Sequence, residues 1–229
     1  MSSYKSWEEV REEGIGLMGS ALGETYILLG ANLVELNVKW GIYRAIYGTS
    51  EDRIKLVNRA AGLFFQTVQN SLWDDILVHI SRLTDRSKVV GKDTLTIQRL
   101  ESLIDCEETL PILKKKVNVA LEKCQFARDW RNRRIAHADL EHKLTPKAKP
   151  LEGASRKKIY DALSSMSGVL NVMSVRYIGG TIMHNESVTL GDAEAILYVI
   201  NDGLRLEKML PEWRKQGNKI ADLFPTEIL

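Results

Sequence analysis

The sequence contains few cysteines and no long apolar run. It has two cysteines, Cys106 and Cys124, and neither has a second Cys or a His nearby at a metal-binding spacing. Its most apolar stretch, residues 26–34, is interrupted by Gly30 and Asn32 and is too short to span a bilayer. The first residues are charged where an export signal would be apolar. We therefore expect a cytoplasmic protein with reduced cysteines and no membrane partner.

An excess of charge of one sign is also missing. The chain has 32 Lys and Arg against 30 Asp and Glu, which leaves a net charge of +2. This total does not require a nucleic-acid partner, but it can conceal a local basic patch. With 44% hydrophobic and 27% charged residues the composition is that of a globular protein, which excludes disordered and collagen-like chains.

Proline is scarce, with five residues, and strand-like alternation is rare, whereas apolar residues recur at spacings of three and four. This pattern predicts an all-α fold. The expected helices begin at a Ser6/Glu9 capping box, cover Leu29 to Tyr47 with an end at Gly48, run from Thr49 or Ser50 to near Asp85, cover about 95–104, start near Thr109 or Pro111, run from Ser155 to Tyr177, and cover about 190–210 with a bend or end at Pro211. Without repeats or long linkers, we predict one domain over residues 1–229, a bundle of about six helices with long antiparallel members.

Two local features carry further expectations. Gly14, Gly16 and Gly19 are expected to loosen the first helix. His142 and His184 lie in loop-like sequence, so we expect both side chains to be exposed.

The helix that starts near Thr109 carries an unusual residue on its apolar face. The apolar positions of this stripe are Leu113, Val117, Ala120, Cys124 and Ala127. Arg131 occupies the next position. A buried Arg needs a partner, so Arg131 should face a carboxylate, a subunit interface or an anionic ligand. Alternatively, its stem packs while its guanidinium reaches water.

The surrounding sequence is the most basic in the chain. Arg128, Arg133 and Arg134 flank Arg131. Asp129, Asp139 and Glu141 partly offset this charge, which favours a local phosphate site over sequence-independent duplex binding.

Residues 126–140, FARDWRNRRIAHADL, resemble the motif of HEPN ribonucleases, in which an Arg and a polar residue precede a His by four to six positions. Arg131, Asn132 and His137 match this pattern. The longer string around them, together with Phe64, Phe65, the segment 81–85 (SRLTD) and Trp40, resembles the U-type abortive-infection branch of the HEPN group.

The resemblance implies metal-independent cleavage of single-stranded or tRNA-like RNA, without a cofactor, by a homodimer whose motif helices face each other. It also implies an antiphage defence protein or toxin, with a possible neutralising antitoxin as partner. In this chemistry His137 is the acid or base, Arg131 holds two phosphate oxygens, and Asn132 supports them. Arg128, Arg133 and Arg134 are the expected substrate contacts. RNA is implied because the attacking group is the ribose 2′-hydroxyl.

The motif spacing favours a dimer. The six positions from Arg131 to His137 correspond on a regular helix to about 9 Å of rise and about 120° of rotation. One helix therefore does not superpose the two side chains, whereas a second subunit can supply the missing partner.

The helix before Asp85 offers competing roles. Asp75, His79, Arg82 and Arg86 form one polar stripe, in which Asp75 and His79 are a possible metal pair. We favour an electrostatic role, with Asp75 or Asp85 pairing with Arg131, Arg134 or Arg82. His79 and Asp139 are further supporting candidates. The alternative function is a non-catalytic helical dimer that binds RNA, a nucleotide or a protein partner.

Overall fold

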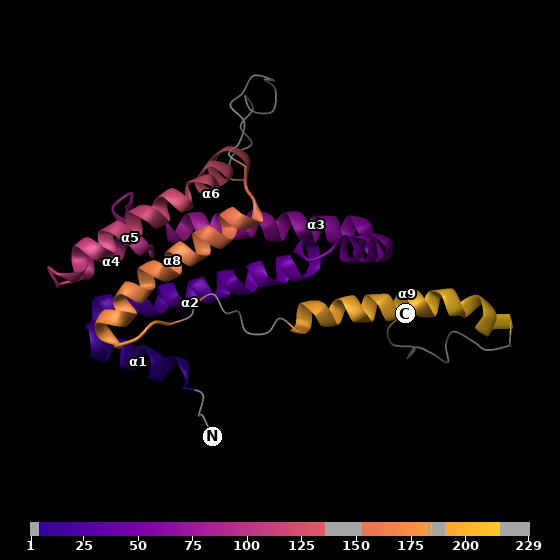
Figure 1. The fold of residues 1–229 in the computed structure, drawn as a ribbon, viewed down its shortest axis with the longest axis horizontal. Helices are drawn as coiled ribbons and strands as arrows, with labels where there is room; N and C mark the ends of the chain where they lie inside the picture. Colours follow the sequence, from indigo (N-terminus) through magenta and orange to yellow (C-terminus); the bar gives the residue numbers. More distant parts are fainter. Residues whose placement is uncertain (1–4, 136–152, 183, 185–190, 216–229) are drawn as a thin grey trace, which may run out of the picture. The chain divides into compact units, whose positions relative to one another are not determined.

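The computed structural model describes residues 5–135, 153–182, 184 and 191–215, and these are almost entirely helical (Figure 1). The prediction of an all-α protein is confirmed. In chain order the elements are α1 (Trp7–Met18), α2 (Ser20–Tyr43), the π-helix η1 (Arg44–Gly48), α3 (Glu51–Leu83), β1 (Lys88–Val89), β2 (Lys92–Asp93), the 3₁₀ helix η2 (Ile97–Arg99), α4 (Leu100–Leu103), α5 (Thr109–Lys123), α6 (Gln125–Trp130), the π-helix η3 (Arg131–Ile135), α8 (Arg156–Tyr177) and α9 (Gly191–Lys215). The strands β1 and β2 form a short antiparallel hairpin.

The chain forms two compact units. The first contains residues 1–41 and 71–188, and the second contains residues 42–70 and 189–229. Helices α2 and α3 contribute to both units because each boundary falls within a helix. The expectation of a single domain over residues 1–229 stays a prediction.

The first unit has a core made by long helices. Leu36 of α2, Ile76 of α3, Leu113 of α5 and Ile159 of α8 are each 0% exposed. Helix α5 packs along α8 (Figure 1). Removing such a side chain from water stabilises the fold by about 1.5–3 kcal/mol. The buried faces of these four helices therefore form the core of the unit.

Helix α1 begins at the predicted capping box. The Glu9 amide donates to Ser6 Oγ at 3.2 Å, and the Ser6 amide donates to Glu9 Oε2 at 2.6 Å. Helix α1 is continuous through Gly14 and Gly16 and ends at Gly19. Gly14 is buried against α2, and a Cβ on Gly23 would lie 2.4 Å from the Gly14 carbonyl oxygen. The two glycines therefore allow the two backbones to approach closely.

The second unit is built by η1, the first part of α3 and α9. Its core consists of six buried residues: Ile46, Tyr47, Val57, Phe65, Ala193 and Leu197. The Tyr47 hydroxyl donates to the Phe65 carbonyl at 2.9 Å, and Arg53 bridges the Ala45 carbonyl and the Glu194 carboxylate. Within α3 the backbone of Ala61 departs from helical geometry (φ −159°, ψ 69°). Gly62 follows directly, and a glycine weakens a helix at this point.

Two other helices differ from their predicted bounds. Helix α9 continues through Pro211 to Lys215, which excludes one of the two predicted outcomes, an end of the helix at Pro211. The helix that was expected to run on from Thr109 is divided, since Cys124 (φ −95°, ψ −1°) ends α5. No helix in the described ranges combines the length and the apolarity that crossing a membrane requires.

Candidate functional site

The candidate site lies where α6 meets η3, at the carboxyl end of α3. The predicted apolar stripe leads to it. Its five members, Leu113, Val117, Ala120, Cys124 and Ala127, are all 0% exposed. Arg131 follows them as the first residue of η3, with 23% of its side chain exposed.

Arg131 faces a carboxylate, as one of the sequence alternatives predicted. Its Nη1 donates to Asp85 Oδ2, just beyond the end of α3. Its Nε donates to Asn132 Oδ1 at 3.1 Å. Two of the three motif side chains are therefore in contact, and the guanidinium is held on the Asp85 side of the helix.

The carboxyl end of α3 is held by two further side chains. Arg128 Nη2 donates to the Thr84 carbonyl at 2.8 Å, and its Nε lies 4.0 Å from Asp85 Oδ1. Gln98 Nε2 donates to the carbonyls of Thr84 at 3.0 Å and Asp85 at 2.8 Å. A helix end presents unpaired carbonyls and partial negative charge, which a cation and an amide satisfy. These contacts hold Asp85 in the position from which its carboxylate binds Arg131.

The other basic residues of the motif helix point in different ways. Arg133 Nη1 lies 3.4 Å from Asp129 Oδ1, one turn earlier. The Arg134 guanidinium lies 4.8 Å from the centre of the Trp130 ring, in a cation–π contact. Arg134 is exposed, so this pair presents a planar cation and an aromatic ring at the surface.

The backbone at Arg131 is not a regular α-helix. Residues Arg131–Ile135 form a π-helix, whose i→i+5 bonds place more residues in each turn. The 120° estimate for the motif spacing assumed regular geometry and does not apply at this segment. His137 and Asp139 lie outside the described residues.

The predicted polar stripe of α3 does not form one site. Asp75 Oδ2 pairs with Lys39 Nζ at 2.8 Å. Of the two carboxylates that the sequence suggested as partners of Arg131, the structure therefore has Asp85 and not Asp75. His79 is 3% exposed, and its Nε2 lies 3.3 Å from Asn32 Oδ1. Burial, assisted by the charge of Lys39, lowers the pKa of His79 below its usual 6.5. The ring is therefore neutral near pH 7 and packs as part of the buried core.

Two more sequence candidates can be placed. Arg82 is exposed on α3. The metal alternative gains no support, since the described ranges contain no group of three or more His, Cys, Asp or Glu side chains that could hold a metal ion. Asp75 and His79 instead have separate partners, Lys39 and Asn32.

Sequence reasoning missed three features of this unit. Arg128 and Gln98 fix the end of α3, and only the three-dimensional packing brings them there. His184 was expected to be exposed but is only 6% exposed, and its Nδ1 lies 3.3 Å from Ser167 Oγ. The loop-like sequence around His184 gave no sign of this burial, because it results from a contact with Ser167 in α8.

A comparison with family models matches residues 19–196 to HEPN_AbiU2, described as AbiU2. The match covers more than half of the chain and includes Asp85, Arg128, Arg131 and Asn132. Neither the curated proteins nor the solved structures contain a match.

Proposed function

The chain belongs to the AbiU2 family of HEPN proteins, and on this premise we propose that it is a metal-independent endoribonuclease. Arg131, Asn132 and His137 are its proposed catalytic residues. The observation that carries the proposal is the position of Arg131, whose guanidinium is set at the end of a buried stripe and oriented by Asp85 and Asn132.

The proposed reaction is an internal transfer within RNA. The ribose 2′-oxygen bonds to the adjacent phosphorus and the bond to the leaving 5′-oxygen breaks, which yields a 2′,3′-cyclic phosphate and a 5′-hydroxyl. His137 carries out one of the two proton transfers, by taking the proton of the 2′-hydroxyl or by donating one to the leaving 5′-oxygen, and water carries out the other. Arg131 offsets the charge that gathers on the non-bridging oxygens.

Asp85 gives this site a defined resting arrangement. A guanidinium offers five N–H donors, and the described contacts of Arg131 use two of them. A phosphate can therefore bind the remaining donors while Asp85 keeps the side chain oriented. Arg134 and Trp130 would contact the neighbouring nucleotides, with Arg133 and Arg128 as further substrate contacts.

We place the reaction in a homodimer, with the motif helices of two subunits facing each other across the RNA. The proposed biological role is that of a toxin or an abortive-infection component in antiphage defence. A neutralising antitoxin protein is the corresponding partner. This role depends on the family membership alone.

One observation favours a second candidate, a helical dimer that binds RNA without cleaving it. Asp85 and Asn132 already engage the Arg131 guanidinium, as they would for a residue with a structural role. The same basic helix would then serve binding only.

The test is incubation of the purified protein with total RNA and with tRNA in EDTA. Wild type should release products ending in 2′,3′-cyclic phosphate, and His137→Ala should stop the release while the protein stays folded. His142→Ala is the matched control, a second histidine close by in the chain, and should cleave like wild type. Absence of cleavage by wild type, or products with a 3′-hydroxyl, would contradict the proposed mechanism.

A further inference from the structure

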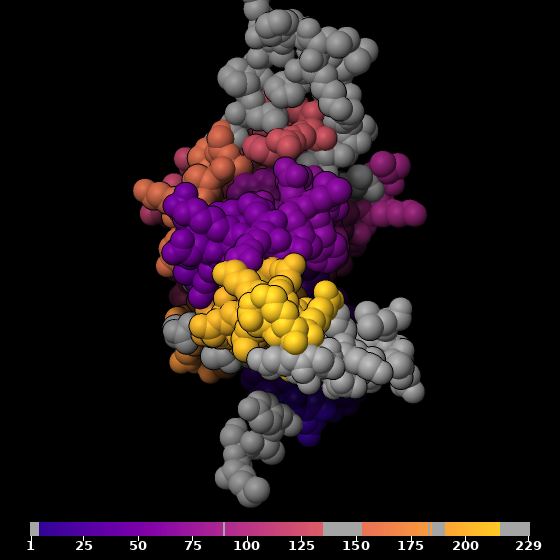
Figure 2. All heavy atoms as spheres, turned by 90° about the vertical axis from the view of Figure 1, so that its right-hand side faces the viewer, coloured from indigo at the N-terminus to yellow at the C-terminus, as the bar shows by residue number. Residues whose placement is uncertain are grey.

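A groove in the second unit has a different character from the candidate site. It lies between the first part of α3 and α9, and Figure 2 shows the side chains of these two segments, violet and yellow, next to each other. Its volume is about 240 Å³. The lining residues are Asp52, Lys55, Leu56, Arg59, Asn201, Leu204, Arg205 and Lys208.

The two walls follow the same helical pattern. Each helix contributes residues at i, i+3, i+4 and i+7, starting from Asp52 on α3 and from Asn201 on α9. This spacing aligns side chains along one face of a helix. Leu56 and Leu204, both partly buried, provide the apolar floor, and the charged residues form the rim.

The rim is strongly basic for a chain of this charge. Four cations and one carboxylate give the lining a net charge of +3, against +2 for the whole protein. Lys55 pairs with Glu51 and Asp52, and Arg205 pairs with Asp202 at 3.9 Å. Within the described ranges, Arg59 and Lys208 have no carboxylate within ion-pair distance.

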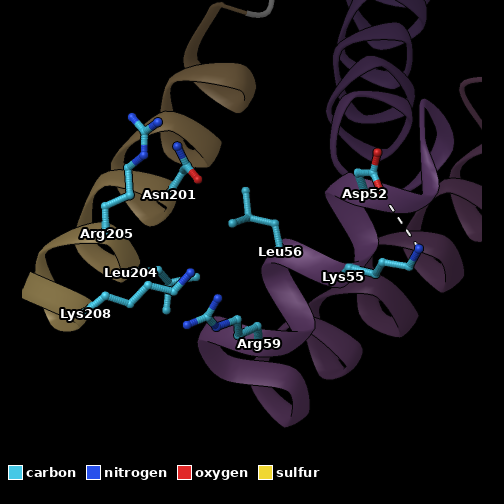
Figure 3. Close-up of a pocket in the computed structure, with 8 residues that line it drawn as sticks. All are labelled: Asp52, Lys55, Leu56, Arg59, Asn201, Leu204, Arg205 and Lys208. Carbon is cyan, nitrogen blue, oxygen red and sulfur yellow. Dashed lines mark ion pairs between the residues drawn. The ribbon is translucent and has the colours of Figure 1, made fainter.

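Figure 3 shows Arg59 and Lys208 reaching toward each other across the groove, whereas Asp52 and Lys55 pair on the side away from α9. Two facing cations repel each other, and an anion placed between them removes that repulsion. The groove is therefore arranged for a negatively charged occupant.

The cations that remain for a ligand fit a repeated anion better than a single one. On α9, Arg205 and Lys208 lie about one helical turn, roughly 5 Å, apart along the axis, and Arg59 faces Lys208 from α3. Tyr198, one turn before Asn201 on α9, is 70% exposed. A basic groove combined with an exposed aromatic ring is the usual arrangement for binding a single nucleic-acid strand, because phosphates bind the cations and a base stacks on the ring.

We propose that this groove binds the phosphodiester backbone of single-stranded RNA, with Arg59 and Lys208 as the main phosphate contacts and Tyr198 as a stacking platform. The choice of RNA rests on the proposed function. The groove belongs to the second unit and Arg131 to the first, so RNA binding by the groove can be tested apart from cleavage.

The test uses the full chain and a fluorescein-labelled 12-nucleotide RNA in which every 2′-oxygen is methylated, so that binding is measured without cleavage. Arg59→Gln/Lys208→Gln should weaken binding about 10-fold or more at 0.1 M salt. The slope of log K against log salt should fall by about 1.4, because each lost phosphate contact to a single strand contributes about 0.7. Tyr198→Leu should weaken binding about 5-fold and leave the slope unchanged.

Lys114→Gln/Lys116→Gln is the matched control, since it removes the same charge from exposed positions on α5. Equal weakening by the groove and control variants would overturn the proposal. So would binding of polyglutamate as tight as that of RNA, which would indicate an acidic protein partner, or absence of RNA binding by wild type. If wild type binds the RNA and the groove variant does not, but unmodified RNA stays uncut, the groove proposal stands and the nuclease proposal fails.

Discussion

Arg131 donates to the carboxylate of Asp85, a residue 46 positions earlier in the chain. The side chains are 23% and 27% exposed, so water screens this ion pair only in part. The contact joins the first residue of η3 to the carboxyl end of α3. Together with the hydrogen bond from Arg128 to the Thr84 carbonyl, it attaches the motif helix to the rest of its unit.

Asp85→Asn should release Arg131 and lower both stability and cleavage. The amide removes the negative charge that orients the guanidinium, so we expect a loss of about 1–2 kcal/mol in the free energy of unfolding, with partial exposure keeping it below the cost for a fully buried pair. Cleavage should fall about 10-fold or more, because the phosphate ligand is no longer positioned. Urea denaturation and cleavage of a labelled RNA measure the two effects.

Asp93→Asn is the control for this variant. It breaks a comparable pair, since Arg99 Nη1 lies 2.6 Å from Asp93 Oδ2 with 25% and 53% of the side chains exposed. Stability should change by less than 1 kcal/mol and cleavage should not change. If Asp85→Asn cleaves as fast as this control, Asp85 has no positioning role.

The close approach of α1 and α2 supplies a second prediction, on stability alone. A Cβ on Gly23 would lie 2.4 Å from the Gly14 carbonyl oxygen, so Gly23→Ala must push the helices apart and should cost about 1–3 kcal/mol. Gly16 is also helical, and a Cβ there meets nothing within 4 Å. Gly16→Ala should therefore stabilise the protein by about 0.5–1 kcal/mol. Thermal denaturation of the two variants tests the packing, and shifts of the same sign would contradict it.

These cases show which features the sequence could predict. The Ser6/Glu9 capping box and the apolar stripe from Leu113 to Ala127 follow from residues close together in the chain, and both predictions are confirmed. The position of Arg131 on that stripe also followed from spacing, and with it the need for a partner.

Features that depend on distant residues were not predictable in the same way. From the sequence, both Asp75 and Asp85 were candidate partners of Arg131. In the structure Asp75 pairs with Lys39, and Asp85 pairs with Arg131. The burial of His184 depends on contact with Ser167 in α8. The π-helical turn at Arg131 has no Gly or Pro to announce it.

The two buried histidines predict that acid destabilises the fold. Burial lowers the pKa of both His79 and His184 below 6.5. The unfolded chain binds a proton at each as the pH falls through about 6.5, whereas the folded chain does so only at lower pH. The stability present above pH 6.5 is therefore lost on acidification, by at most about 1.4 kcal/mol per pH unit for each histidine.

The measurement is the urea midpoint between pH 8 and pH 5. His79→Gln/His184→Gln should flatten the dependence in the range below pH 6.5. An unchanged profile in the double variant would mean that other groups cause the acid sensitivity.

The two cysteines should differ strongly in reactivity. The hydroxyl of Thr109, 3.2 Å from Cys106 Sγ, lowers the pKa of Cys106 to about 7, with help from Arg176. Burial raises the pKa of Cys124 to about 12. Iodoacetamide at pH 7.5 should therefore modify Cys106 in the folded protein and leave Cys124 intact, as peptide mass spectrometry would show. Thr109→Val should slow the labelling, and equal rates for the two thiols would contradict the described environments.

The last prediction separates the charge of Arg131 from its shape. Arg131→Lys keeps one positive charge near Asp85 but cannot offer two parallel N–H donors to a phosphate. Stability should fall by less than about 1 kcal/mol, whereas cleavage should fall about 10²-fold, close to the loss expected for a missing charge stabiliser. In the double variant with Asp85→Asn the losses in cleavage should not add, because both changes disturb the same guanidinium. Additive losses would show that Asp85 and Arg131 act independently, and full activity of Arg131→Lys would remove the guanidinium from the reaction.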